Sequence, residues 1–374
     1  MAHIDPALRR AKEAVEKDLL NRPGVTGVDI GFKEVGGKRT DKLAIRVLVR
    51  KKRDVRSEDR IPESIEGFAS DVIERKYAPQ VLALDVELLA QADTEQYESL
   101  KGGISIGPCR PVGGTVLGGT LALPVKDNAT GKVMLLSNFH VLCGDRSWAV
   151  GDAIAQPARL DRGRCPASAV ALLQRAVLDG KVDCAVAEVT ARTASSEIVD
   201  IGEITGTNEV SIDQPVRKRG RTTGLTYGFV DSVDVTAIID YPGIGEITLT
   251  NQIDVRPDTA RNSRFSDSGD SGSAVVNAAG EVVGLHFAGN AADGHAAANP
   301  IASVLAALKV TIPATTTSPG TPPPPGTTSS RTRSGRPPVL APYPPPWSPP
   351  QRPPDPLPFP PAWSLLLRHN WRSS

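Results

Sequence analysis

The chain has 374 residues, with 43 Lys and Arg against 42 Asp and Glu, giving a formal net charge of +1. Such balanced charge offers no broad basic field for binding nucleic acid, and no stretch is long and apolar enough to span a membrane. The length predicts more than one domain. The charged N-terminus lacks the apolar core of a signal peptide, so we expect a cytoplasmic protein.

Residues 1–100 predict a small α+β domain. Asp5 and Pro6 favour a helix start, and strands are expected at 25–32, 43–49 and 81–88. A second helix is expected from about residue 62, with its buried stripe formed by Ile65, Phe68, Ala69 and Val72. We interpret this domain as a fixed accessory domain; a prosegment and a partner-binding module are the alternatives. The acidic stretch 89–101 is the predicted linker and cleavable joint.

Residues 101–312 predict a mainly β domain. Short β-branched or alternating runs are separated by turns rich in Gly, Asp and Asn, and a helix is expected at 300–308. The expected strands are 115–123, 133–137, 183–189, 215–218, 229–235, 246–250, 273–276 and 282–287.

Three residues in this domain suit nucleophilic catalysis. Ser271 lies in the run Gly-Asp-Ser-Gly, His140 follows an apolar strand, and Asp183 leads another. A serine hydroxyl needs a histidine base, and a carboxylate bound to Nδ1–H of that histidine leaves Nε2 free to take the proton. The glycines beside Ser271 allow a tight turn that aims the N–H groups of Gly269 and Ser271 at one point, an expected oxyanion hole.

The order His140, Asp183, Ser271, within SNFHVL, VDCAVAEV and SDSGDSGSAVV, resembles the trypsin-like (chymotrypsin-fold) serine proteases. The resemblance covers about residues 104–312. It implies a double β-barrel with the triad in the cleft and a serine endopeptidase that cuts a protein or peptide substrate without metal or other cofactor.

Three residues define the expected substrate pocket. His286, in EVVGLHFAGN, resembles the Gly-x-His segment of bacterial glutamyl endopeptidases, and Ser266 matches a hydroxyl position in the same pocket. This likeness implies a preference for acidic P1 residues, P1 being the residue on the acyl side of the cut bond; a shallow pocket for small residues is the alternative. Phe265 at the pocket floor argues against Lys or Arg at P1, with Asp267 the nearest rival.

The segment KRGRTTGLTYG resembles plant narrow-leaf-type trypsin-like proteins and their bacterial relatives. Its basic run, Arg217, Lys218, Arg219 and Arg221, predicts a solvated strand edge. Four cysteines, Cys109, Cys143, Cys165 and Cys184, lack metal-ligand spacing and are expected to be free thiols, although Cys143 and Cys165 bracket one loop and could pair.

Residues 313–374 hold most of the chain's 33 prolines and predict a disordered tail, a spacer or a ligand for a partner that recognises polyproline II. The sequence leaves the oligomeric state open. It also leaves two rivals to the protease. One is a non-catalytic scaffold that binds partners through the N-terminal domain and tail, and the other is a protease that mainly cuts itself, near 91–101 or in the tail.

Overall fold

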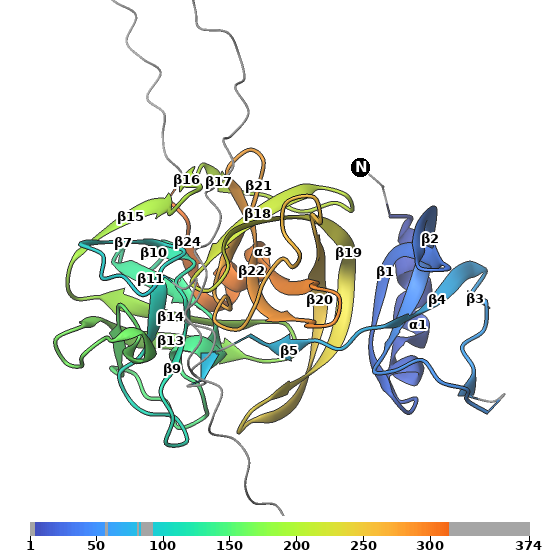
Figure 1. Ribbon diagram of the computed structural model, residues 1–374, viewed down its shortest axis with the longest axis horizontal. Coiled ribbons are helices and arrows are strands. Elements are labelled where there is room, and N and C mark those ends of the chain that lie inside the picture. Colours follow the sequence, from blue (N-terminus) through green and yellow to red (C-terminus); the bar gives the residue numbers. More distant parts are fainter. Residues whose placement is uncertain (1–3, 57–58, 81, 84–92, 314–374) are drawn as a thin grey trace, which may run out of the picture. The chain divides into compact units, whose positions relative to one another are not determined.

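The structure, a computed structural model, describes residues 4–56, 59–80, 82–83 and 93–313 (Figure 1). These residues belong to one compact unit. The predicted tail and most of the strand expected at 81–88 lie outside them. The described part is mainly β, as the sequence predicts, and its strands form a chymotrypsin-like arrangement. None of its helices is long and apolar enough to cross a membrane.

Two large sheets and one small sheet account for the strands of the described residues. The first, of nine strands, has the order β24 (Val310–Thr311), β10 (Leu123–Asp127), β11 (Val133–Ser137), β14 (Asp183–Val189), β13 (Ala169–Leu178), β12 (Ala153–Ala155), β8 (Ser105–Pro108), β9 (Leu117–Thr120), β6 (Leu82–Ala83). The small sheet has the order β16 (Gly202–Glu203), β15 (Thr193–Ile198), β7 (Ser99–Gly102).

The second large sheet has twelve strands among the described residues. Its order is β18 (Pro215–Gly220), β21 (Ala274–Asn277), β22 (Glu281–Gly289), β23 (Ala296–Pro300), β20 (Gly245–Pro257), β19 (Gly224–Tyr241), β1 (Val25–Val35), β2 (Lys38–Val49), β4 (Phe68–Glu74), β3 (Ser64–Ile65). Two further strands, β5 (Ala78–Pro79) and β17 (Gly206–Thr207), pair with β22.

A shared apolar core fixes one large sheet against the other. Leu136 and Val186 of the first sheet belong to the same buried cluster as Val276 and Leu285 of the second. The helix α3 (Ile301–Leu308), expected from the sequence, adds Val304 to this cluster. Burial of apolar surface stabilises the folded state by about 25 cal/mol per Å². The shared core therefore fixes the position of one large sheet relative to the other.

The N-terminal residues extend the second sheet. Helix α1 (Pro6–Leu20) begins as predicted, with Asp5 as its N-cap, and β1 pairs with β19 through Gly27 and Ala237. The second predicted helix is wrong, because residues 64–74 form β3 and β4. Gly67, with φ of 82°, turns the chain between these strands, and β4 then pairs in parallel with β2.

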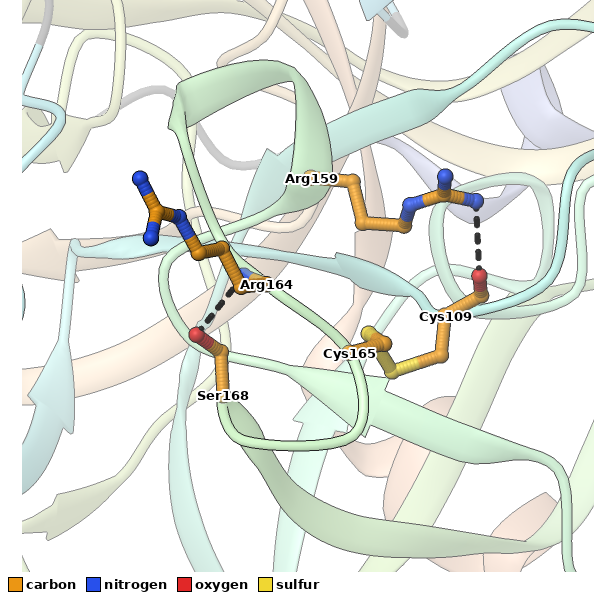
Figure 2. The surroundings of a disulfide bond; sticks show 5 residues. All are labelled: Cys109, Arg159, Arg164, Cys165 and Ser168. Carbon is orange, nitrogen blue, oxygen red and sulfur yellow. Dashed lines mark hydrogen bonds between the residues drawn. A yellow bond between two sulfur atoms is a disulfide. The ribbon is translucent and has the colours of Figure 1, made fainter.

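The cysteine prediction is also corrected. Cys109 and Cys165 form a disulfide, and Arg159 donates to the Cys109 carbonyl at 3.0 Å (Figure 2). The alternative pair, Cys143 with Cys165, does not form, because Cys143 is a buried free thiol, as is Cys184. Spacing along the chain could not reveal the partner, since the disulfide joins residues 56 positions apart.

The predicted joint at 89–101 is partly built into the fold. Strand β7 pairs in parallel with β15, and Asp93 forms an ion pair with Arg219 at 2.5 Å. The joint before residue 93 lies outside the described residues.

Candidate active site

His140 and Asp183 meet at one end of the first sheet. His140 lies on the short helix α2 (Phe139–Leu142) that follows β11, and Asp183 opens β14, which pairs with β11. His140 Nδ1 lies 2.5 Å from Asp183 Oδ2, and the backbone N–H of His140 donates to Oδ1 at 3.3 Å. Both side chains are buried. The carboxylate therefore fixes the ring with Nε2 directed elsewhere.

Three further groups hold Asp183 in place. The Tyr241 hydroxyl donates to Asp183 Oδ2 at 2.9 Å, Asn138 Nδ2 donates to the Asp183 carbonyl, and Asn299 Oδ1 accepts from its N–H. Burial, together with the negative charge of Asp183, raises the pKa of Tyr241 well above its ordinary value, so the hydroxyl stays a donor. No sequence motif marked Tyr241.

Ser271 lies in a loop whose backbone conformation requires glycine at two nearby positions. Gly269 and Gly272 have φ of 97° and 95°, and a Cβ on Gly272 would lie 2.0 Å from the Thr120 carbonyl oxygen. Ser271 Oγ donates to the Phe287 carbonyl at 2.8 Å. His140 Nε2 is buried and has no hydrogen-bond partner within the described part of the chain. The hydrogen bond expected between Ser271 and His140 is therefore not formed in this state.

A buried ion pair holds the loop that contains Ser271. Lys218 Nζ lies 2.8 Å from Asp270 Oδ2, and the N–H groups of Thr222 and Thr223 donate to Oδ1. Burial raises the pKa of Asp270, but the charge and hydrogen bond of Lys218 outweigh it and leave that pKa below its ordinary value. Asp270, next to Ser271, is thus a fixed anion.

The predicted solvated basic edge is therefore wrong. Lys218, Arg219 and Arg221 are buried, and each has a carboxylate partner: Asp270, Asp93 and Asp161 respectively. Cations can be buried where such partners compensate for lost hydration, and a run of charge in the sequence does not show whether partners exist.

The expected oxyanion hole is occupied by the chain's own backbone. The N–H groups of Gly269 and Ser271 donate to the carbonyl oxygen of Gln80, at 2.6 and 3.4 Å. The N–H of Gln80 faces the Phe287 carbonyl at 3.3 Å and Ser271 Oγ at 3.1 Å. Two donors from one loop thus converge on one carbonyl, that of Gln80, which nothing in the sequence marked.

His286 faces the side chain of the same residue. His286 Nε2 lies 2.7 Å from Gln80 Oε1, and Nδ1 lies 3.1 Å from the Ala297 carbonyl. A Cβ on Gly289 would overlap the Gln80 amide, so this glycine opens the space that Gln80 fills. Burial, aided by Lys218, lowers the pKa of His286 to about 3, and the ring is neutral near pH 7.

The other residues of the expected pocket differ in their surroundings. Phe265 is fully buried within an apolar cluster that also contains Val216 and Val255. Ser266 Oγ is buried and has no partner among the described residues, so it can still accept or donate a hydrogen bond. Asp267, the rival for a basic pocket, forms an ion pair with Arg264 at 2.5 Å.

One cluster has the side chains of a metal site. Asp231, Asp254 and His295 bring ligand atoms within 4.8 Å of one another. The same carboxylates accept hydrogen bonds from Arg46 and Arg75, at 2.7 and 2.8 Å. Two guanidinium cations already neutralise this cluster, so its chemistry is that of a buried ion-pair network.

No protein-family model and no curated protein matches the sequence. Solved structures of serine proteases are similar in fold. Protease A of Thermobifida fusca is 16% identical with a TM-score of 0.42, over 57% of this chain and 97% of its own. The chymotrypsin of Cellulomonas bogoriensis is 16% identical with a TM-score of 0.41, over 58% and 100%. A serine protease described as specific for glutamic acid is 19% identical with a TM-score of 0.41, over 57% and 99%.

Proposed function

We propose that the protein is a serine endopeptidase that works through an acyl-enzyme. One observation carries this proposal: the N–H groups of Gly269 and Ser271 converge on a peptide carbonyl beside Ser271 Oγ. In the mechanism, Ser271 Oγ attacks such a carbonyl carbon and His140 Nε2 takes its proton. Asp183 orients the ring and stabilises its charged form. The two N–H groups stabilise the oxyanion of the tetrahedral intermediate.

The pocket supports a preference for glutamine at P1. A neutral His286 whose Nδ1–H donates to the Ala297 carbonyl has an accepting Nε2, and the opposite tautomer has a donating one. Gln80 presents its accepting Oε1 to Nε2, which suits the tautomer that donates from Nε2, and the same amide turned over presents its NH2 group to the tautomer that accepts there. A glutamine therefore satisfies either tautomer. Ionised glutamate only accepts, and its best partner is an imidazolium, which this buried site disfavours. Glutamate, the acidic residue expected from the sequence, is then the second choice.

The test is incubation of the protein with a library of unstructured peptides, followed by mass spectrometry of the products. We expect cuts after glutamine with the wild type and none with Ser271→Ala, which removes the nucleophile. Asp183→Asn is expected to lower turnover by about 10⁴, because it reverses the tautomer of His140. Cleavage that persists in Ser271→Ala contradicts the mechanism.

A non-catalytic scaffold is the second candidate, and one observation favours it. The cleft holds the protein's own Gln80, and Ser271 Oγ bonds to Phe287 instead of His140. A scaffold cuts no peptide in the library under any condition, whereas a protease whose cleft is blocked cuts peptides once the block is removed.

A further inference from the structure

The segment Tyr77–Gln80 lies across the candidate active site in the way a substrate does. Strand β5 pairs antiparallel with β22, placing Ala78 opposite Gly289 and Pro79 opposite Ala288. The chain then presents the Gln80 carbonyl to Gly269 and Ser271, and the Gln80 side chain to His286. Gln80 is 8% exposed. Backbone pairing, the carbonyl and the side chain are thus bound by three different parts of the site.

The pairing continues beyond Gln80. Strand β6 pairs antiparallel with β9, with Leu82 opposite Gly118 and Ala83 opposite Leu117. On the acyl side of the peptide bond that follows Gln80, strand β5 pairs with the second sheet. On the amine side, strand β6 pairs with the first sheet. An endopeptidase must bind its substrate on both sides of the bond that it cuts, because such binding fixes that bond near the nucleophile.

We propose that the chain cleaves itself after Gln80, with Gln80 as the P1 residue, and that the N-terminal fragment remains bound to the rest. This proposal rests on the proposed function and names the enzyme's first substrate. The sequence placed a self-cleaved joint near 91–101; the structure places it eleven or more residues earlier.

The reaction needs only water. The Ser271 hydroxyl turns from the Phe287 carbonyl to His140 Nε2, gives it the proton and forms a bond to the Gln80 carbonyl carbon. The C–N bond then breaks, and His140 passes the proton to the departing amine of Val81. Water attacks the resulting ester, giving its proton to His140. The Ser271 Oγ–carbon bond breaks, Ser271 recovers a proton, and Gln80 ends as a carboxylate.

Contacts away from the cleft hold the N-terminal fragment in place after cleavage. Strand β1 stays paired with β19, and Arg46 and Arg75 stay bonded to Asp231 and Asp254. Each of these contacts joins a residue before the cut to one after it, and none depends on the cut bond itself. We therefore expect two chains that separate only under denaturing conditions. The new carboxylate of Gln80 remains beside the oxyanion hole and competes with other substrates.

The experiment follows the full chain by intact mass after refolding from denaturant with its disulfide intact. We expect two fragments, one ending at Gln80 and one beginning at Val81, which elute together in native gel filtration. The rate should not change with protein concentration, and wild type mixed with Ser271→Ala should leave the variant whole, because each chain's segment fills its own cleft.

Two matched variants test the role of Gln80. Gln80→Arg is expected to slow self-cleavage at least about 100-fold, because it brings a second cation, with no carboxylate of the described residues placed to pair with it, into the buried space between His286 and Lys218. The same change elsewhere, Gln91→Arg, is expected to leave the rate unchanged. Cleavage at 91–101 in place of Gln80, or equal rates in the two variants, overturns the proposal.

A peptide assay separates failure of this proposal from failure of the proposed function. The peptide Lys-Tyr-Ala-Pro-Gln-Val-Leu-Ala, taken from residues 76–83, is given to the wild type and to Gln80→Arg. If the wild-type chain stays intact while the wild type or Gln80→Arg cuts the peptide, self-cleavage is wrong and the endopeptidase stands, with Tyr77–Gln80 acting as an uncut inhibitor. If neither the peptide nor the chain is cut, both proposals fail.

Discussion

Lys218 and Asp270 form an ion pair in which neither side chain is exposed to solvent, with Nζ 2.8 Å from Oδ2. Asp270 directly precedes Ser271 in the chain, so its ion pair with Lys218 fixes the turn that presents the N–H groups of Gly269 and Ser271. Because Asp270 is charged and has a partner inside the protein, this turn is held by the fold and does not depend on a group released by proteolysis.

Removing the cation should therefore damage both stability and turnover. Lys218→Met leaves Asp270 buried without its cation, which costs about 3–5 kcal/mol of unfolding free energy. Displacement of the loop is expected to lower kcat about 100-fold with little change in KM, since the N–H donors act mainly on the transition state. Peptide kinetics and urea unfolding measure the two effects. Lys181→Met, at an exposed lysine, is the control, and unchanged kcat in Lys218→Met contradicts the positioning role.

Tyr241 is expected to act through Asp183. Tyr241→Phe removes the hydroxyl that donates to Asp183 Oδ2 at 2.9 Å, a bond worth roughly 1.5 kcal/mol because its acceptor is charged. If that energy is lost in the transition state, kcat falls about 10-fold. Tyr227→Phe, at a tyrosine whose ring packs against Arg261, provides the comparison. Equal rates for the two variants contradict a role for Tyr241 in orienting the site.

The parts of the site that the sequence predicted are those with local signals. The strands expected at 133–137 and 183–189 coincide with β11 and β14, because each is a short apolar run ended by polar residues. His140 and Asp183 were found beside these strands, and Ser271 between glycines. Each of these residues carries its signal within a few neighbours, so its setting could be recognised without knowing the fold.

The parts that the sequence did not reveal depend on remote partners. Lys218 meets Asp270 across 52 positions, and Gln80 meets Ser271 across 191. The run Arg217–Arg221 has the composition of an exposed edge, and only the fold shows its carboxylate partners. The same limit explains residues 64–74, where apolar spacing fits a helix but pairing of β4 with β2 decides for a strand.

The N-terminal residues are expected to depend on Arg46 for their attachment. Arg46 is unexposed and bonds Asp29 and Asp231, each at 2.7 Å, so it links β2 to β1 and β19. Arg46→Met leaves two buried carboxylates without this cation and should lower the unfolding free energy by about 3–5 kcal/mol.

Denaturant unfolding of the full chain measures this loss. The control is Arg261→Met, which removes an arginine that is 60% exposed and lies 3.5 Å from Asp258. Exposed pairs contribute less than about 1 kcal/mol, so the control should unfold almost like the wild type. If the two variants lose equal stability, the buried network is not what holds the N-terminal residues.

His286 should make stability depend on pH in a defined window. Burial, with Lys218 and His140 adding to it and Asp270 opposing, lowers its pKa in the folded protein from 6.5 to about 3. The unfolded chain therefore binds a proton below about pH 6.5 that the folded chain does not bind until about pH 3. The stability contributed by the neutral ring is present above pH 6.5 and is lost as the pH falls through this window.

The measurement compares unfolding free energies of the wild type and His286→Asn between pH 7.5 and 4. Other titrating groups affect both proteins alike, so the difference isolates His286. We expect the wild type to lose up to about 1.4 kcal/mol more per pH unit below pH 6.5, and the two curves to run parallel above it. Parallel curves throughout mean that His286 is solvated or charged in the folded protein. In that case the pocket has an imidazolium donor, and the preference at P1 shifts from glutamine to glutamate.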